Sequence, residues 1–112
     1  MKLIGKNNGH MMAVKFLYSA VDELNNKSEV TVTDFLALSA FVTAEKLELE
    51  IYESALVEDG RELSGDSRAY LDLLQQMAAD LSKPHHGIEN AIFDAHSSAG
   101  CVFYNWGLNK EE

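Results

Sequence analysis

The sequence contains a single cysteine, Cys101, and a single proline, Pro84. One cysteine cannot form an intrachain disulfide, which excludes a disulfide-stabilised scaffold and fits a reducing compartment. Cys101 has no basic side chain near it in the sequence except His96, so we expect a buried small side chain rather than a nucleophile. The near absence of proline is typical of a chain that is rich in helix.

Long hydrophobic runs are also missing from the sequence. No uncharged apolar stretch approaches the roughly 20 residues that a membrane-spanning helix needs. Residues 1–9 carry lysines but lack the apolar core of a secretory signal. We therefore expect a cytoplasmic protein that does not act at a membrane.

Basic residues are few, because 9 Lys and Arg stand against 18 Asp and Glu, for a formal net charge of −9. A protein that binds nucleic acid needs a basic face to displace counterions, so we expect no direct binding to DNA or RNA. The apolar fraction of 46% is too high for a disordered acidic tail. A length of 112 residues predicts a single helical domain over 1–112, with flexible ends at 1–9 and 109–112.

The sequence does contain helical periodicity, in which apolar residues recur every three or four positions. The first three periodic segments are 10–25, 34–58, and 66 or 67 to 81. A fourth helix is expected to begin at Pro84, whose missing N–H suits a first turn, and to end within 97–100. Residues 101–108 are the most aromatic stretch, and we expect them to pack as a short helix or an extended segment. The prediction is an all-α, compact bundle of about four helices with a short aromatic C-terminal segment.

The segment 34–58 is predicted to be the longest helix. Thr31 and Asp34 match the capping-box pattern, with Thr33 as an alternative N-cap, and Asp59-Gly60 ends the segment. The polar arc predicted to face solvent consists of Ser39, Thr43, Lys46, Glu50 and Glu53. The apolar residues predicted to cover the other faces are Leu38, Phe41, Ala44, Leu47, Ile51, Tyr52, Ala55 and Leu56. Residues 47–51 also alternate with a period of two, so a strand is a competing interpretation there.

The negative charge is concentrated in one part of the chain. Residues 1–44 hold four Lys and four acids, whereas residues 45–80 hold ten acids against Lys46, Arg61 and Arg68, a net charge of −7. Residues 81–112 supply the remaining −2. One interpretation is a solvated face that keeps the protein soluble. The other is a docking surface for a basic partner, because dense charge of one sign raises association rates and selects partners.

The docking interpretation leads to a functional hypothesis. We expect a small acidic binding protein, specifically a stoichiometric inhibitor of the immunity-protein type that neutralises a basic toxin or nuclease. Tyr52 would anchor the contact and the carboxylates would steer it. The predicted contact residues are Glu45, Glu48, Tyr52, Glu53, Glu58, Asp59, Glu62 and Asp66. The alternatives are a phage anti-defence protein that mimics the charge of DNA, and a structural subunit that oligomerises through 102–108 and the apolar face of 10–25.

Glu45 and Glu48 fall on the apolar side of the predicted long helix. Buried carboxylates without partners are costly, so their position needs an explanation. One interpretation places them at the margin of the core, where they reach water or meet Lys15 or Arg68. The others are that they are paired inside the core, or that this apolar surface belongs to an interface.

No motif in the sequence names a reaction. His85, His86 and His96 lie near acidic residues, but His85 and His96 would be about 16 Å apart along a helix, so one ion cannot bind both. We expect the first two on the surface of a first helical turn and His96 half-buried. The hydroxyl, thiol and imidazole groups of 94–101 crowd one segment and include no nucleophile elbow. The expectation is a protein without enzymatic activity, metal or cofactor.

Overall fold

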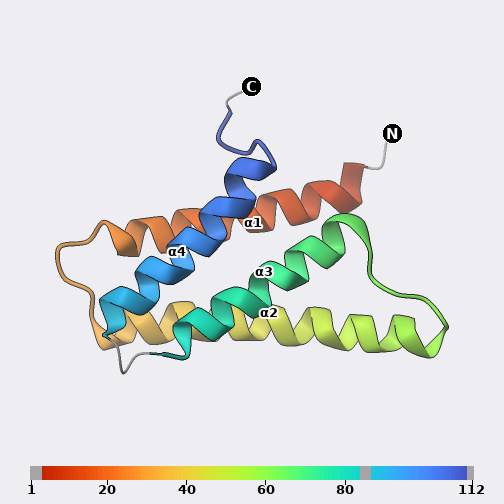
Figure 1. Cartoon of the computed structure of the whole chain (residues 1–112), viewed down its shortest axis with the longest axis horizontal. Coiled ribbons are helices and arrows are strands. Elements are labelled where there is room, and N and C mark those ends of the chain that lie inside the picture. The colour runs from red at the N-terminus through yellow and green to blue at the C-terminus, as the bar shows by residue number, and fades with distance from the viewer. Residues whose placement is uncertain (1–3, 84–86, 111–112) are drawn as a thin grey trace.

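The structure is a computed structural model that describes residues 4–83 and 87–110. Within these residues it contains four helices and no strand, so the predicted all-α bundle is confirmed and residues 47–51 are helical. The helices are α1 (Ile4–Asn25), α2 (Val32–Glu58), α3 (Gly65–Leu81) and α4 (Ile88–Asn105), as Figure 1 shows. In this part of the chain, no helix has both the length and the apolar character needed to cross a membrane.

The two ends of α2 follow from local hydrogen bonds. The Thr31 hydroxyl accepts a bond from the N–H of Asp34 at 3.0 Å, and the Asp34 carboxylate accepts one from the N–H of Thr31 at 3.2 Å. The predicted capping box is therefore confirmed. At the other end Gly60 has a φ of 74°, and the N–H of Arg61 donates to the carbonyl of Leu56 at 2.8 Å. This Schellman arrangement needs a left-handed residue, which glycine supplies without strain.

Two helices extend beyond their predicted limits. α1 begins at Ile4 instead of at His10. Glycine at position 9 does not stop the helix, because one glycine costs a helix interior only about 1 kcal/mol. α4 continues through Asn105 instead of ending within 97–100, and the aromatic segment forms mostly its last turns. Half-buried Val102 and Phe103 extend the packed face of α4, which favours the longer helix. The predicted start at Pro84 lies outside the described residues.

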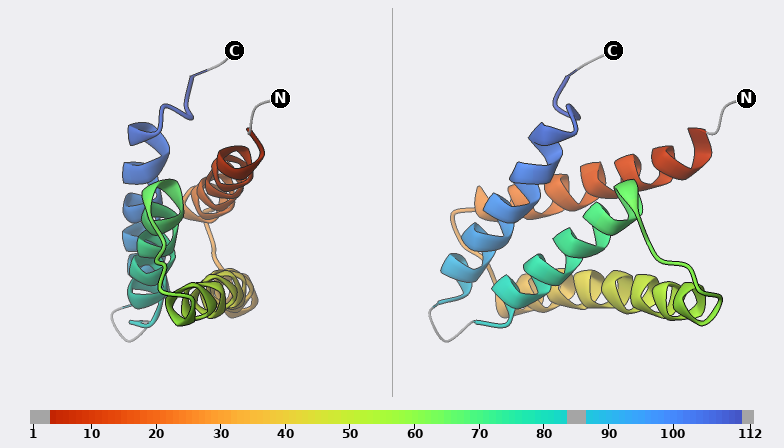
Figure 2. Two further views of the ribbon diagram at one scale, coloured as in Figure 1. Left: turned by 90° about the vertical axis from the view of Figure 1, so that its right-hand side faces the viewer. Right: turned by 45° about the vertical axis from the view of Figure 1, so that its right-hand side comes forward.

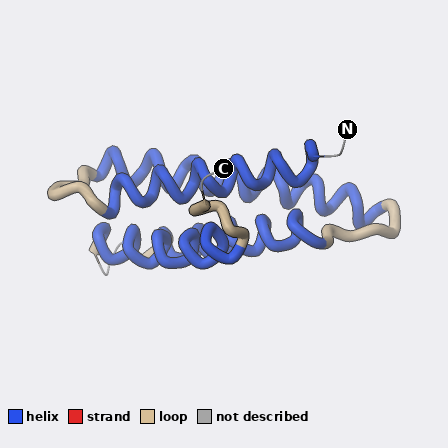
Figure 3. Tube along the Cα trace, turned by 90° about the horizontal axis from the view of Figure 1, so that it is seen from above, coloured by secondary structure: helices blue, strands red, loops and turns tan. Residues whose placement is uncertain are grey.

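The helices are arranged in two layers. Seen from the side, α3 and α4 form one layer and α1 and α2 the other (Figure 2), and the view from above shows the same two rows (Figure 3). α1 packs on α4, α4 on α3 and α3 on α2, whereas α1 and α2 touch far less. The molecule measures 44 × 36 × 19 Å. Its radius of gyration of 14.8 Å exceeds the roughly 13 Å of a compact chain of this length, because the array is open between α1 and α2.

The core lies between the two layers. Its largest fully buried side chains include Leu17 of α1, Val42 of α2, Leu74 and Met77 of α3, and Ile92 of α4. The stripe predicted for the third helix is buried as expected at Tyr70, Leu73, Leu74, Met77 and Leu81. A second, smaller cluster of buried residues, Leu56, Leu63 and Leu71, packs the connection between α2 and α3 against both helices.

α2 is oriented differently from the prediction. Phe41, Leu47, Ile51 and Tyr52 were predicted to lie on the faces away from the polar arc predicted to face solvent, and these residues are 37%, 49%, 71% and 54% exposed. The buried residues of α2 are Phe35, Leu38, Val42 and Leu56. Conversely, Lys46, Glu50 and Glu53 of the predicted solvent-facing arc are half-buried. Because apolar residues occur on all sides of α2, periodicity could not identify its inner face.

Candidate functional site

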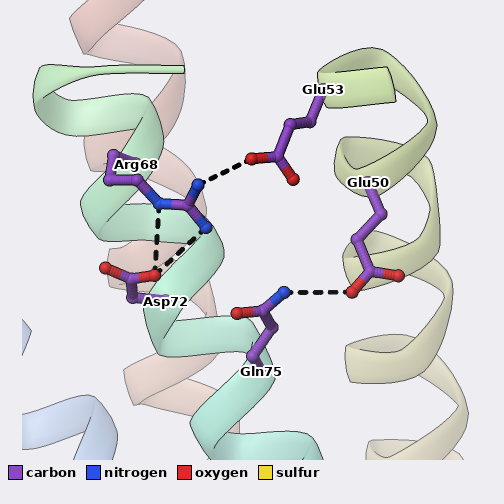
Figure 4. Close-up of polar contacts among 5 residues, drawn as sticks. All are labelled: Glu50, Glu53, Arg68, Asp72 and Gln75. Atoms are coloured by element: carbon purple, nitrogen blue, oxygen red, sulfur yellow. Dashed lines mark hydrogen bonds and ion pairs between the residues drawn. The ribbon is translucent and has the colours of Figure 1, made fainter. Parts of the chain in front are cut away.

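One edge of α2 pairs its acidic residues with α3 (Figure 4). Arg68 Nη1 donates to Glu53 Oε2 at 2.7 Å, and the Arg68 guanidinium also pairs with Asp72 at 3.2 Å. The hydrogen bond to Glu53, reinforced by Asp72, raises the pKa of the Arg68 guanidinium. Gln75 donates to Glu50 at 3.1 Å. The charge of Glu53 is therefore compensated within the molecule.

Glu45 is held by a hydrogen bond from the buried Tyr70 hydroxyl, at 3.0 Å. Burial of the Tyr70 phenol, followed by the nearby carboxylates of Glu45 and Glu48, raises its pKa. Glu45 is half-buried at the margin of the core, but its partner is Tyr70 rather than Lys15 or Arg68. Glu48 is exposed, in agreement with a margin position that reaches water.

His10 of α1 contacts two residues of α3, Ser67 and Tyr70. The Nε2 atom of His10 lies 3.0 Å from the hydroxyl oxygen of Ser67, and the ring centroids of His10 and Tyr70 are 5.2 Å apart. His10 and Tyr70 line a groove of about 390 Å³ together with Glu48 and Tyr52. Over the described ranges no carboxylate bonds to His10, so this serine–histidine pair has no third group that would orient it as in a nucleophilic triad. Sequence reasoning missed the pair because its members are 57 positions apart.

The other acidic residues of the predicted contact lie at the end of α2, in the α2–α3 connection and in the first turn of α3, toward the right of Figure 1. We call these residues the acidic end, which consists of Glu58, Asp59, Glu62 and Asp66. The first three are exposed, and Asp66 is half-buried in the first turn of α3, where the helix dipole favours a carboxylate. The buried Leu63 anchors the connecting segment, so its charged neighbours remain at the surface.

Tyr52 lies beside the acidic end. With Arg61, Glu62 and Ser64 it lines a groove of about 320 Å³. The structure thus brings Tyr52 together with Glu62 of the acidic end. Glu45 and Glu53 bond to α3 instead, and Glu48 lies in the groove that it lines with His10, Tyr52 and Tyr70.

A further surface, which we call the α2 stripe, consists of exposed apolar residues on the outer side of α2. Its members are Leu36, Ala40, Ala44, Leu47, Ile51 and Ala55, all of which are exposed. The sequence placed Ala44, Leu47, Ile51 and Ala55 on the apolar faces of the helix without deciding which face is inward. The available signal was that α2 carries more apolar residues than one face can hold. One interpretation of the position of Glu45 and Glu48 was that the apolar surface around them belongs to an interface.

The aromatic residues at the end of α4 pack on α1. Phe103 stacks on Tyr18 with ring centroids 4.2 Å apart, and the hydroxyls of Tyr18 and Tyr104 are 3.4 Å apart. This hydrogen bond, followed by burial, raises the pKa of Tyr18 to about 12. Phe103 and Trp106 are half-buried against the core. Much of the segment expected to support oligomerisation is therefore used within the chain.

One histidine of the C-terminal part, His96, lies beside this aromatic contact. His96 is half-buried, as predicted, with its Nε2 atom 2.9 Å from Asp22 Oδ1 and its ring 5.2 Å from that of Tyr18. His85 and His86, expected on the surface, lie outside the described residues. Among residues 4–83 and 87–110, no three His, Cys, Asp or Glu side chains are grouped so that they could hold a metal ion.

Cys101 is exposed, so the prediction of a buried thiol is wrong. The helix continues through this position instead of ending before it. Ala95 and Ala99 mark the buried face of α4. Two residues beyond Ala99, a helix has turned by about 200°, which directs Cys101 away from that face.

Comparison with known proteins supplies no relative from which a function could be carried over. No family model matches the sequence, and neither the curated proteins nor the solved structures give a significant match. The chemistry of these surfaces is therefore the basis on which a function can be inferred.

Proposed function

We propose that this chain is a small acidic binding protein that neutralises a basic protein, as a stoichiometric inhibitor of the immunity-protein type does. The observation that carries the proposal is the acidic end beside Tyr52. Glu58, Asp59 and Glu62 are exposed, and none of their side chains forms a hydrogen bond or ion pair within residues 4–83 and 87–110. Glu50 and Glu53, in contrast, already have partners on α3.

Free carboxylates on one surface favour a partner that is rich in lysine or arginine. They accelerate its approach and reject acidic competitors by repulsion. The ring of Tyr52 is 54% exposed and offers a face on which an arginine or lysine can stack. Glu62 lines the groove beside Tyr52 and offers such a side chain a carboxylate, and the exposed Arg61 lines the same groove. The basic surface covered in this way would be the substrate-binding cleft of a toxin or nuclease.

The proposal is tested by reversing the charge of the acidic end. The partner is first captured from an extract of the native host and purified, and its affinity is then measured by calorimetry. Glu58→Lys, Asp59→Lys and Glu62→Lys combined should weaken binding at least about 100-fold, because attraction becomes repulsion. The matched control combines Glu29→Lys, Glu89→Lys and Asp94→Lys, which change the net charge equally at exposed positions elsewhere. This control should weaken binding less than about threefold, since it alters only the long-range field.

Two results would contradict the proposal. Equal losses in both triple variants would mean that net charge matters but the acidic end does not. Unchanged affinity in the first variant, with helix content retained, would remove this surface from the contact altogether. Capture of several unrelated DNA-handling proteins in place of one partner would favour the DNA-mimic alternative.

A further inference from the structure

The outer side of α2 presents an apolar stripe that the described part of the chain leaves uncovered. Leu36, Leu47 and Ile51 are 57%, 49% and 71% exposed, and Ala40, Ala44 and Ala55 lie exposed between them. From Leu36 to Ala55 the stripe is about 28 Å long. No member is charged, and such a contiguous apolar surface is typical of an interaction site.

The order of residues in the α2 stripe is symmetric. Successive members are separated by 4, 4, 3, 4 and 4 positions, so the spacing is the same in both directions. If two copies of α2 pair in antiparallel orientation about the midpoint between Ala44 and Leu47, every large side chain faces an alanine. The opposing pairs are Leu36 with Ala55, Ala40 with Ile51, and Ala44 with Leu47. Large side chains opposite small ones interdigitate and allow two helices to approach closely.

We propose that the α2 stripe is a homodimer interface, in which a two-fold axis relates two copies and their α2 helices run antiparallel. A two-fold interface must be complementary to itself, and the alternation of large and small residues meets this condition. An unrelated partner would not require the stripe to be symmetric. The occupant that fits the stripe best is therefore a second copy of this chain.

Charge also favours the antiparallel arrangement. It separates the two acidic ends by about 37 Å along the paired helices, since each lies near the C-terminus of its α2. This separation exceeds the Debye length of about 8 Å at physiological ionic strength several times. A parallel pair would bring the two acidic ends together and add repulsion between them.

The available area indicates a dimer of moderate affinity. A stripe of this length and one helix diameter in width covers roughly 300 Å². Phe41 lies at its edge, and its ring contacts the exposed Phe16 of α1 with centroids 5.3 Å apart. One turn earlier on α1, Met12 is 65% exposed. These flanks extend the apolar surface toward the roughly 600 Å² per partner at the lower end of specific interfaces, so we expect dissociation in the micromolar range.

Analytical ultracentrifugation of the purified chain tests the interface. Between about 1 and 200 µM the protein should shift from monomer to dimer. Ala44→Glu should weaken the dimer at least about 30-fold, because it sets two carboxylates beside the two-fold axis in an apolar contact. Ala79→Glu is the matched control, since Ala79 is an exposed helical alanine on α3, away from the stripe. It should leave the dimer unchanged, and circular dichroism should show native helix content in both variants.

A mixing experiment tests the antiparallel register. Ala44→Glu and Leu47→Lys should each be monomeric alone, because each introduces charge into the stripe. An equal mixture should form a dimer, since the proposed pairing sets position 44 of one copy beside position 47 of the other. In the heterodimer, Glu at position 44 of one copy faces Lys at position 47 of the other copy. At the second, symmetry-related contact the unchanged Leu47 of the first copy faces the unchanged Ala44 of the other.

The outcomes are distinct from those of the proposed function. A wild-type chain that remains monomeric throughout the range overturns the interface. If the Ala44→Glu variant still forms a dimer, the α2 stripe is not the interface. If the mixture of the two variants fails to associate, the antiparallel register is wrong. None of these results affects binding by the acidic end, whose charge-reversal variant is predicted to dimerise normally.

Discussion

Asp80 shows how a single polar residue connects two helices. Its side chain is buried on α3, where Gln76 Nε2 donates to one carboxylate oxygen at 3.0 Å and the Ser98 hydroxyl of α4 donates to the other at 2.7 Å. Both oxygens are therefore satisfied despite burial. A buried acceptor that loses its donor keeps the cost of desolvation, so the contact from α4 contributes to the packing of the two helices.

Ser98→Ala should lower the free energy of unfolding by about 1–2 kcal/mol, because one oxygen of Asp80 loses its donor. Urea denaturation measures this change. Ser97→Ala is the control, since Ser97 is the exposed neighbour on the same helix and should change stability by less than about 0.5 kcal/mol. Equal effects of the two substitutions would show that the hydrogen bond to Asp80 does not stabilise the fold.

Asp34 makes stability depend on pH at the start of α2. The hydrogen bond from Lys27 at 2.9 Å, followed by that from the N–H of Thr31, lowers the pKa of Asp34 below its ordinary value of 3.8. A pKa that is lower in the folded state stabilises the fold at pH values above 3.8, and this contribution disappears as the pH falls through the folded pKa.

Asp34→Asn should therefore be less stable than the wild type at neutral pH, and the difference should shrink as the pH falls below 3.8. Urea denaturation across this range measures the difference. Asp94→Asn removes an exposed carboxylate from α4 and should change stability little at neutral pH. If the Asp34→Asn difference were constant over the whole range, the carboxylate charge would not be its source.

At the scale of helices, glycine acts differently at an end and in an interior. Gly60 ends α2 with a positive φ of 74°, whereas Gly9 lies inside α1. A Cβ atom at either position would meet no heavy atom within 4 Å. Backbone conformation therefore decides the effect of a side chain at these two sites, without interference from packing.

The same substitution should have opposite effects at these positions. Gly60→Ala should destabilise the protein by about 1–2 kcal/mol, because alanine pays a steric cost in the left-handed region. Gly9→Ala should stabilise it by up to about 1 kcal/mol, because alanine favours the interior of a helix. Thermal unfolding of the two variants tests both signs, and a loss of stability in Gly9→Ala would contradict a regular helix at that position.

At the scale of the whole molecule, the helices differ in how many neighbouring helices they pack against, because α1 and α2 make little contact with each other. α3 packs against α4, α2 and α1, whereas α2 packs mainly on α3 and leaves its outer side exposed. Local opening should therefore need less free energy in α2 than in α3. Of the acidic residues on this less supported helix, Glu45, Glu50 and Glu53 bond to α3, whereas Glu58 of the acidic end is exposed.

Hydrogen exchange on a dilute sample should reveal this order. The amides of α3 from Leu71 to Leu81 should exchange slowest, and those of α2 from Ala44 to Tyr52 should exchange faster, because solvent reaches one whole side of α2. Raising the protein concentration should slow exchange in α2 of the wild type but not of Ala44→Glu, since only a dimer covers the stripe. Equal protection of α2 and α3 at low concentration would contradict the open array.

The sequence by itself determined the features that depend on neighbours in the chain. The capping box of Thr31 and Asp34, the stop at Gly60 and the buried stripe of α3 all follow from bonds or periodicity within a few residues. It also located the negative charge in residues 45–80, since charge is a property of composition. These local rules were sufficient to predict an all-α bundle, although the limits of α1 and α4 were predicted too short.

Only the tertiary structure decided which side of α2 faces inward. Its apolar residues surround the helix, so the choice depends on partners such as Arg68 and Tyr70 on α3, which bond to Glu53 and Glu45. The pairing of His10 with Ser67 was equally invisible in the sequence. Such contacts join residues that are distant in the chain, and the orientation of a helix depends on the sum of all its contacts with the neighbouring helices. For this reason, the acidic end and the α2 stripe became separate surfaces only in the folded molecule.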